Sequence, residues 1–174
     1  RIYRHKVLRI NYTTYDLRCA QDSINPCTHA DIMVLSCEDD DGTAKHHYYW
    51  YAHVIGVYHA NIIYTGPGAK TTEPQRMEFL WVRWFGRDGP SRYKSSWKAQ
   101  APHRVGFVDA EAGGAFGFLN PNPVIRAVHL IPAFHYGRTR SLLPPSIIRP
   151  KADNDVDYWF YYIGMYANFL QSHY

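Results

Sequence analysis

The amino-acid sequence predicts a mostly β fold, a small barrel with loops rich in glycine and proline. β-Branched and aromatic residues dominate its apolar stretches, and these residue types suit the pleated surface of a sheet. The stretches are short and end at turn-forming sequences that contain glycine, proline or aspartate. With 174 residues, of which 46% are hydrophobic, the chain suits a single domain over residues 1–174.

The N-terminal part of the chain predicts an arm and then strands. We interpret residues 1–30 as a basic arm or edge strand, because the sequence is basic and then rich in turn formers. Residues 31–37 (DIMVLSC) predict a short strand that ends at the acidic turn EDDDG. Residues 48–68 are apolar on both strand faces and predict one long or bent strand, or two, through the core. Gly56 is a candidate site for a β-bulge within it.

The next segment, residues 77–88 (MEFLWVRWFGRD), predicts a strand internal to the sheet, because both of its faces are largely apolar. In a strand, Arg83 shares one face with Phe79 and Trp81. We therefore expect deep burial for at least two members of a set of five, namely Phe79, Leu80, Trp81, Val82 and Trp84.

Further elements follow toward the C-terminus. The sequence predicts strands over residues 104–109 and 124–134, separated by a loop with glycine and proline. Residues 138–154 form an extended proline-rich connection. Residues 155–170 predict a strand start and a possible short C-terminal helix. Three alternating acids lie where the connection ends, namely Asp153, Asp155 and Asp157. They lack the glycine and the distal glutamate of a calcium loop, so we interpret them as a solvated acidic turn.

The charge distribution suggests an anionic partner. Residues 1–18 carry five basic residues against one acid, and residues 76–104 carry seven against two, although the net charge is only +4. The aromatic content of 16% argues against a disordered chain. The three cysteines are an odd number, which favours a reducing, intracellular compartment. The chain starts without Met at a charged residue and therefore looks like a fragment of something longer.

Several long blocks of the chain resemble a module near the C-terminus of basidiomycete transposon-encoded proteins of the Plavaka type. They are spread over residues 7–166 and include INYTTYDLR, DSINPCTHADIMVL, RMEFLWVRWFGRD and AFGFLNPNPVIRAVHLIPAF. The resemblance implies a fungal origin, a nuclear location and a catalytic part outside this segment. The order of YWYAHVIGVYHAN, FLWVRWFGRD and VIRAVHLIPAF is also similar to bromo-adjacent homology (BAH) domains of chromatin proteins. That resemblance implies a BAH-like barrel and a docking or reader module, which often holds a methylated lysine with aromatic residues.

Sites for metal or phosphate chemistry have weak support in the sequence. The candidate zinc ligands lack the paired C-x2-C spacing of structural sites, so we expect unrelated thiols, no cofactor and folding without metal or disulfide; they are Cys19, Cys27, His29 and Cys37. Residues 66–72 (GPGAKTT) lack the spacing of a phosphate-binding loop. The alternative to a binding module is a fragment of a metal-dependent nuclease or transposase, whose carboxylates would come from Asp16, Asp31 and Asp88.

Two sets of residues are candidates for ligand binding. An aromatic pocket for a cation needs several ring faces and a carboxylate, and the candidates are Trp50, Tyr51, Trp84 and Asp88. A basic loop suited to phosphate contacts contributes Arg92, Lys94, Lys98 and Arg104. The sequence therefore predicts a non-catalytic binding module that docks onto chromatin, DNA, a histone tail or another region of its parent protein.

Overall fold

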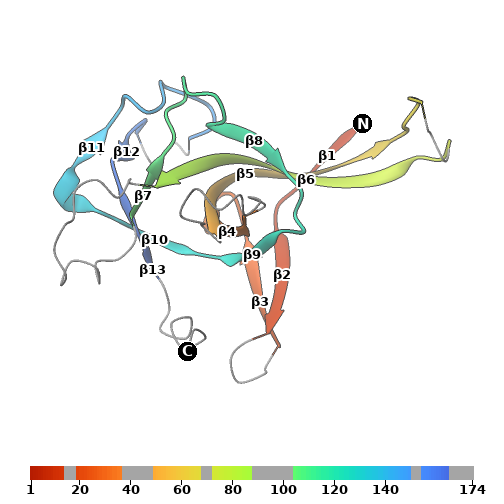
Figure 1. Cartoon of the computed structure of the whole chain (residues 1–174), viewed down its shortest axis with the longest axis horizontal. Helices are drawn as coiled ribbons and strands as arrows, with labels where there is room; N and C mark the ends of the chain where they lie inside the picture. The colour runs from red at the N-terminus through yellow and green to blue at the C-terminus, as the bar shows by residue number, and fades with distance from the viewer. Residues whose placement is uncertain (14–18, 37–48, 68–71, 88–103, 150–153, 165–174) are drawn as a thin grey trace, which may run out of the picture.

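The computed structural model is built from antiparallel β-strands, which confirms the predicted mostly β class (Figure 1). The described residues are 1–13, 19–36, 49–67, 72–87, 104–149 and 154–164. Within them, no helix is long and apolar enough to cross a membrane. The possible C-terminal helix lies outside the described residues, which end at residue 164.

The largest element of the fold is a nine-stranded sheet, with the two longest strands at its centre. These are β5 (Tyr49–Ile62) and β6 (Gln75–Arg87), in a path with the order β10-β13-β7-β6-β5-β4-β9. Two more strands join beside this path, β1 (Ile2–His5) on β5 and β8 (Phe116–Leu119) on β6. The remaining strands of the path are β4 (Asp31–Leu35), β7 (Arg104–Phe107), β9 (Val124–Ala127), β10 (His129–Pro132) and β13 (Tyr161–Gly164).

The two ends of this strand order are consecutive in the chain, because only Val128 separates β9 from β10. The Val128 N–H donates to the carbonyl of Asp31, the first residue of β4, at 2.9 Å, and the Ala133 N–H donates to the Phe160 carbonyl next to β13 at 2.9 Å. The single strand predicted over residues 124–134 is thus two strands with different partners. Hydrogen bonds do not close the described sheet into a complete barrel, so the prediction is correct for the mostly β class rather than for a closed barrel.

Two hydrophobic clusters lie on the two faces of the central strands. The first takes one residue from each of six strands, namely Met33, Tyr51, Phe85, Val105, Leu130 and Ile163. The second lies on the opposite face and includes Leu80 and Val82, both fully buried, which confirms the expected internal position of β6. The hairpin of β2 (Leu8–Thr13) and β3 (Cys19–Ile24) packs against this second cluster through Ile24.

The predicted bulge in the long strand is present. Val54 pairs with Val82 and Gly56 pairs with Trp81, so Ile55 is an extra residue on β5. An extra residue moves the following side chains to the other face of a strand. The bulge therefore lets both Val54 and Val57 join the second cluster.

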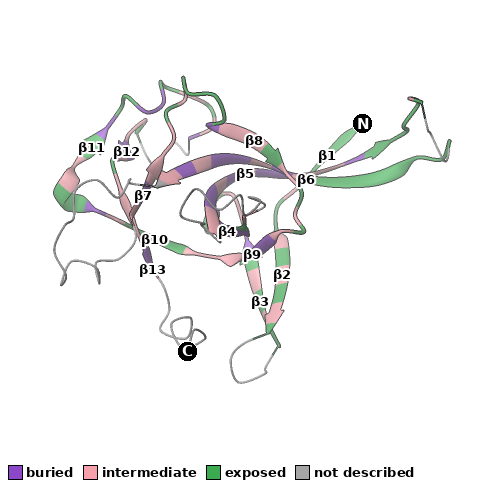
Figure 2. Cartoon of the chain, in the orientation of Figure 1, coloured by how far each residue is buried: buried purple, intermediate pink, exposed green. Residues whose placement is uncertain are grey.

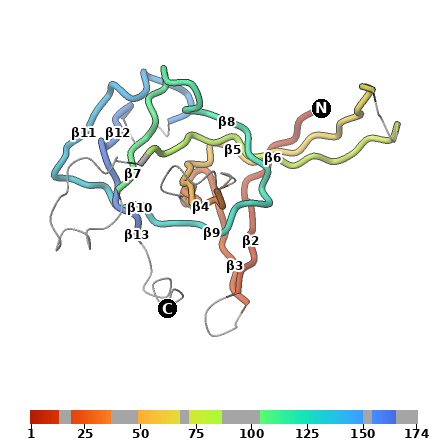
Figure 3. Tube along the Cα trace, in the orientation of Figure 1, coloured from red at the N-terminus to blue at the C-terminus, as the bar shows by residue number. Residues whose placement is uncertain are grey.

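The C-terminal part of β5 and the N-terminal part of β6 project from the rest of the sheet as a ribbon, with β1 beside them (Figure 3). We call these three segments the arm, and the rest of the sheet the body. Figure 2 shows that β6 is exposed along the arm and largely buried in the body.

Two segments predicted as irregular contain strands. β8 lies in the loop between residues 110 and 123, and β11 (Arg138–Thr139) begins the proline-rich connection. β11 pairs with β12 (Asp157–Tyr158), which returns the connection to the body. Between β10 and β11 lies a turn of 3-10 helix, η3 (Phe134–Tyr136), and the two strands pair in succession with β13 and β12.

Candidate functional site

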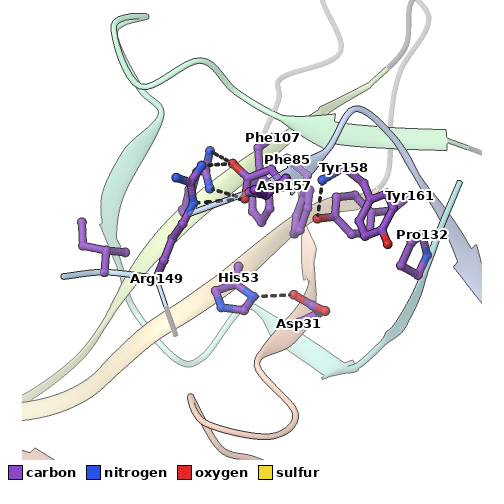
Figure 4. A pocket seen from close by; sticks show the side chains of 12 residues that line it. Asp31, His53, Phe85, Phe107, Pro132, Arg149, Asp157, Tyr158 and Tyr161 are labelled. Atoms are coloured by element: carbon purple, nitrogen blue, oxygen red, sulfur yellow. Dashed lines mark hydrogen bonds and ion pairs between the residues drawn. The ribbon is translucent and has the colours of Figure 1, made fainter. Parts of the chain in front are cut away.

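A pocket of about 260 Å³ lies beside the proline-rich connection, at the end of β5 and β6 that is opposite to the arm (Figure 4). Strands β4, β5, β6, β7 and β10 contribute to its walls, together with the C-terminal part of the described chain. Its lining combines aromatic rings with charged groups and consists of Asp31, His53, Arg83, Phe85, Phe107, Pro132, Ile148, Arg149, Val156, Asp157, Tyr158 and Tyr161.

Arg83 brings a charge into this interior because it has the same strand parity as the buried Phe85. The side chain is only 3% exposed. Its guanidinium carbon lies 3.8 Å from the centre of the Phe107 ring, a cation–π contact. Its terminal nitrogens donate to both carboxylate oxygens of Asp157, at 3.3 and 3.0 Å, and at 3.4 Å to the Leu142 carbonyl.

Arg149 approaches the same carboxylate from the proline-rich connection. It forms an ion pair with Asp157 and donates to the carbonyls of Leu143, at 2.7 Å, and Asp155, at 3.0 Å. Arg149 is 4% exposed and Asp157 is 7% exposed. Two buried guanidinium groups therefore share one buried carboxylate. This finding corrects the interpretation of a solvated acidic turn, because Asp157 faces inward and Asp155 is half-buried.

The opposite wall carries a second polar pair, Asp31 with His53. These residues face each other across the β4–β5 ladder, which brings the carboxylate Oδ1 to 2.8 Å from the imidazole Nδ1. About a quarter of each side chain remains exposed. The His53 ring also contacts Phe107 edge-on, with 6.1 Å between the ring centres. This pair therefore lies at the rim of the pocket, where solvent and ligand have access.

Aromatic rings fill the space between these polar groups. Phe85 and Phe107 stack with 4.1 Å between their centres, and Tyr161 meets both edge-on at 5.7 Å. The Tyr161 hydroxyl accepts a hydrogen bond of 3.3 Å from the backbone N–H of Tyr158. Burial raises the pKa of Tyr161 to about 12, since a phenolate is poorly solvated there. Its hydroxyl therefore stays protonated at neutral pH.

The structure does not bring the predicted aromatic pocket together. Tyr51 is buried and pairs with Phe85, in the first cluster. Trp84 pairs with the neighbouring Ala52 and packs on the opposite face, against the second cluster. Trp50 shares the strand parity of Ala52, and its indole N–H donates to the Ser36 hydroxyl at 3.0 Å. Tyr51 is thus separated from the two tryptophans by the sheet, and Asp88 lies outside the described residues.

The predicted nucleic-acid contact is described at one residue only. Arg104 is half-buried on β7, and its guanidinium lies over the rings of Tyr136 and Phe160. The other three members of that set are outside the described residues, namely Arg92, Lys94 and Lys98. Contact with DNA through this loop stays a prediction.

Of the predicted metal ligands, Cys19 and Cys27 are exposed free thiols, while Cys37 lies outside the described residues. Of the acids proposed for a nuclease, Asp31 lines the pocket, and Asp16 and Asp88 are not described. The described ranges hold no group of three or more histidine, cysteine, aspartate or glutamate side chains placed to bind a metal.

Comparison with known proteins gives no relatives. No family model, curated protein or solved structure matches this chain.

Proposed function

We propose that this domain is a non-catalytic binding module that docks onto a partner polypeptide by taking one of its side chains into the pocket. The observation that carries the proposal is a partly open cavity in which aromatic walls surround fixed polar groups. Binding sites typically have this composition, because apolar walls supply affinity and a few polar groups fix orientation.

The size of the pocket favours a side chain as the ligand. The cavity volume is about 260 Å³. Pockets for drug-sized molecules and cofactors are about 300–1,000 Å³. The resemblance to transposon and chromatin proteins makes histone tails, or another region of the parent protein, the first partners to test.

The test is selection of binding peptides from a phage-displayed random library, followed by a matched pair of variants. Ile148 lines the pocket, whereas its neighbour Ile147 is fully exposed. Ile148→Trp should fill the cavity and abolish binding of the selected peptides, and Ile147→Trp should leave it unchanged. An array of peptides that tile the core histones is the second probe.

Two outcomes would overturn the proposal: no enrichment of any peptide, or equal binding to both tryptophan variants. Circular dichroism shows whether each variant is folded. If Ile148→Trp does not fold, Val156→Phe fills the cavity from another lining position and replaces it in the comparison.

A further inference from the structure

We infer that the side chain taken into this pocket carries an anionic group, either a carboxylate or a phosphate. The inference rests on the proposed function, since it names the chemical class of the ligand for the same pocket. It is carried by the charges, the hydrogen-bond donors and the ring faces that the lining residues leave for a ligand.

The buried charges do not balance. Arg83 and Arg149 contribute two positive charges, and Asp157 contributes one negative charge, with all three side chains at most 7% exposed. These three groups therefore retain one positive charge that is largely removed from water. The second carboxylate of the lining, Asp31, lies at the rim, where about a quarter of its side chain is exposed and His53 engages it. Buried charge is unfavourable unless it is paired, so a second anion in the adjoining cavity would stabilise this arrangement.

Two polar hydrogens of the lining residues also lack an acceptor, one on the fully buried Arg83 Nε and one on the Tyr161 hydroxyl. The Arg83 Nε–H has no acceptor, and it is the one buried side-chain nitrogen or oxygen without a partner in the described part of the chain. The other nitrogens of Arg83 are engaged by Asp157 and the Leu142 carbonyl, and Arg149 also has carbonyl partners in addition to Asp157. The Tyr161 hydroxyl accepts from a backbone N–H, which leaves its own proton to donate. Both Arg83 and Tyr161 line the cavity.

The same geometry disfavours a cationic ligand such as a methylated lysine. A methylammonium group needs open aromatic faces. One face of Phe107 is already covered by the guanidinium of Arg83. The carboxylate of Asp31 is already engaged by His53, and a cation beside Arg83 and Arg149 would meet like charge. The pocket thus differs from the methyl-lysine site that the BAH resemblance implies.

The test is an NMR titration of the isotope-labelled chain with four N-acetyl, N-methylamide amino acids. Glutamate and phosphoserine supply the two anions, glutamine is the neutral match for glutamate, and trimethyllysine is the cation. Amide resonances of Phe107, Asp157 and Tyr158 report on the pocket. We expect at least one anion to bind about tenfold or more tightly than glutamine, because hydrogen bonds to charged groups are the stronger ones. The affinities of glutamate and phosphoserine, compared with each other, show whether the pocket prefers a carboxylate or a phosphate.

Variants assign the binding to this pocket. Ile148→Trp should abolish the shifts caused by the anion, and Ile147→Trp should not. Tyr161→Phe removes one donor with little change in volume and should weaken the anion severalfold, and more than it weakens glutamine, because hydrogen bonds to charged groups are stronger. Binding of both anions no tighter than that of glutamine, tighter binding of trimethyllysine than of either anion, or no shift by either anion would overturn the inference. Peptides that still bind through the pocket in any of these cases would leave the proposed function standing.

Discussion

The two ends of the β5–β6 ribbon share one ladder but lie in different surroundings. In the body, Tyr51 pairs with Phe85, and both side chains are buried. In the arm, Ile62 pairs with Gln75, and both are exposed. The arm is therefore held mainly by backbone hydrogen bonds and by the third strand β1, since a two-stranded ribbon alone is marginal in water.

The comparison also holds along a single face of β6. Arg83 and Phe85 point into the body, whereas Met77, of the same strand parity, is 50% exposed in the arm. Ile2 on β1, which is linked to Met77 through Ala60 of β5, is 66% exposed. Burial on this face thus depends on whether other strands pack over the residue, as they do over Phe85, and less on how apolar the residue is.

The largest expected effect tests this difference in burial. Phe85→Ala should destabilise the fold by about 3–5 kcal/mol, because it removes a large ring from a filled core. Met77→Ala, on the same face in the arm, should change the free energy of unfolding by about 0.5 kcal/mol or less. Urea denaturation followed by circular dichroism measures both. Similar losses for the two variants would mean that the arm is covered in solution.

The ion pairs of the two regions should differ in the same direction. Asp157→Ala leaves two buried guanidinium groups without their carboxylate and should cost about 3–5 kcal/mol. Glu78→Ala breaks the Arg76–Glu78 pair of the arm, in which both side chains are more than half exposed, and should cost about 0–1 kcal/mol. Thermal or urea unfolding distinguishes the two. A small loss for Asp157→Ala would show that water reaches the two arginines.

Alkaline pH should weaken the body through Tyr161. Burial raises the pKa of Tyr161 from the ordinary 10.0 to about 12, so the folded chain holds the phenol proton more tightly than the unfolded chain does. This contribution, about 2–3 kcal/mol, is complete below pH 10 and is lost as the pH rises through about 12. Tyr161→Phe should therefore lose less stability than the wild type over this window. Parallel stability–pH curves would contradict the assignment.

The smallest effect belongs to the arm. Partial desolvation, then the nearby Arg76 and His5, lower the pKa of His59 below 6.5. The rings of Tyr3 and His5 both stack on His59, with 4.8 Å between centres. The neutral ring is therefore favoured in the folded arm, an advantage present above pH 6.5 and lost as the pH falls through the lowered pKa. An NMR titration of His59 should give a midpoint that Arg76→Gln raises; an unchanged midpoint would exclude the arginine as a cause.

Much of the sheet could be predicted because strand signals are local. The apolar residues of β4, β5 and β6 lie next to one another in sequence, and Gly56 marked the bulge. β8 was missed because its FGFL sequence lies among glycine, asparagine and proline residues. The break at Val128 was missed because β9 pairs with β4 and β10 pairs with β13, and both partners are distant from this segment in the chain.

The pocket could not be predicted for a similar reason. Arg83 and Asp157 are 74 residues apart, and no spacing links them. The signal that the sequence offered was an arginine within an apolar strand, on the same face as Phe79 and Trp81. An arginine in such a position needs a buried acid, but the sequence does not say which acid supplies the charge.

The continuity of β9 and β10 also bears on aggregation. An exposed strand edge is a template for pairing with other chains, and proteins usually cover or shorten such edges. Here one uncut backbone holds the two ends of the strand order together at Val128. A protease cut at this residue would leave the number of strands unchanged but let the ends separate. The two end strands, each paired on one side only in the described sheet, would then be more accessible to other chains in solution.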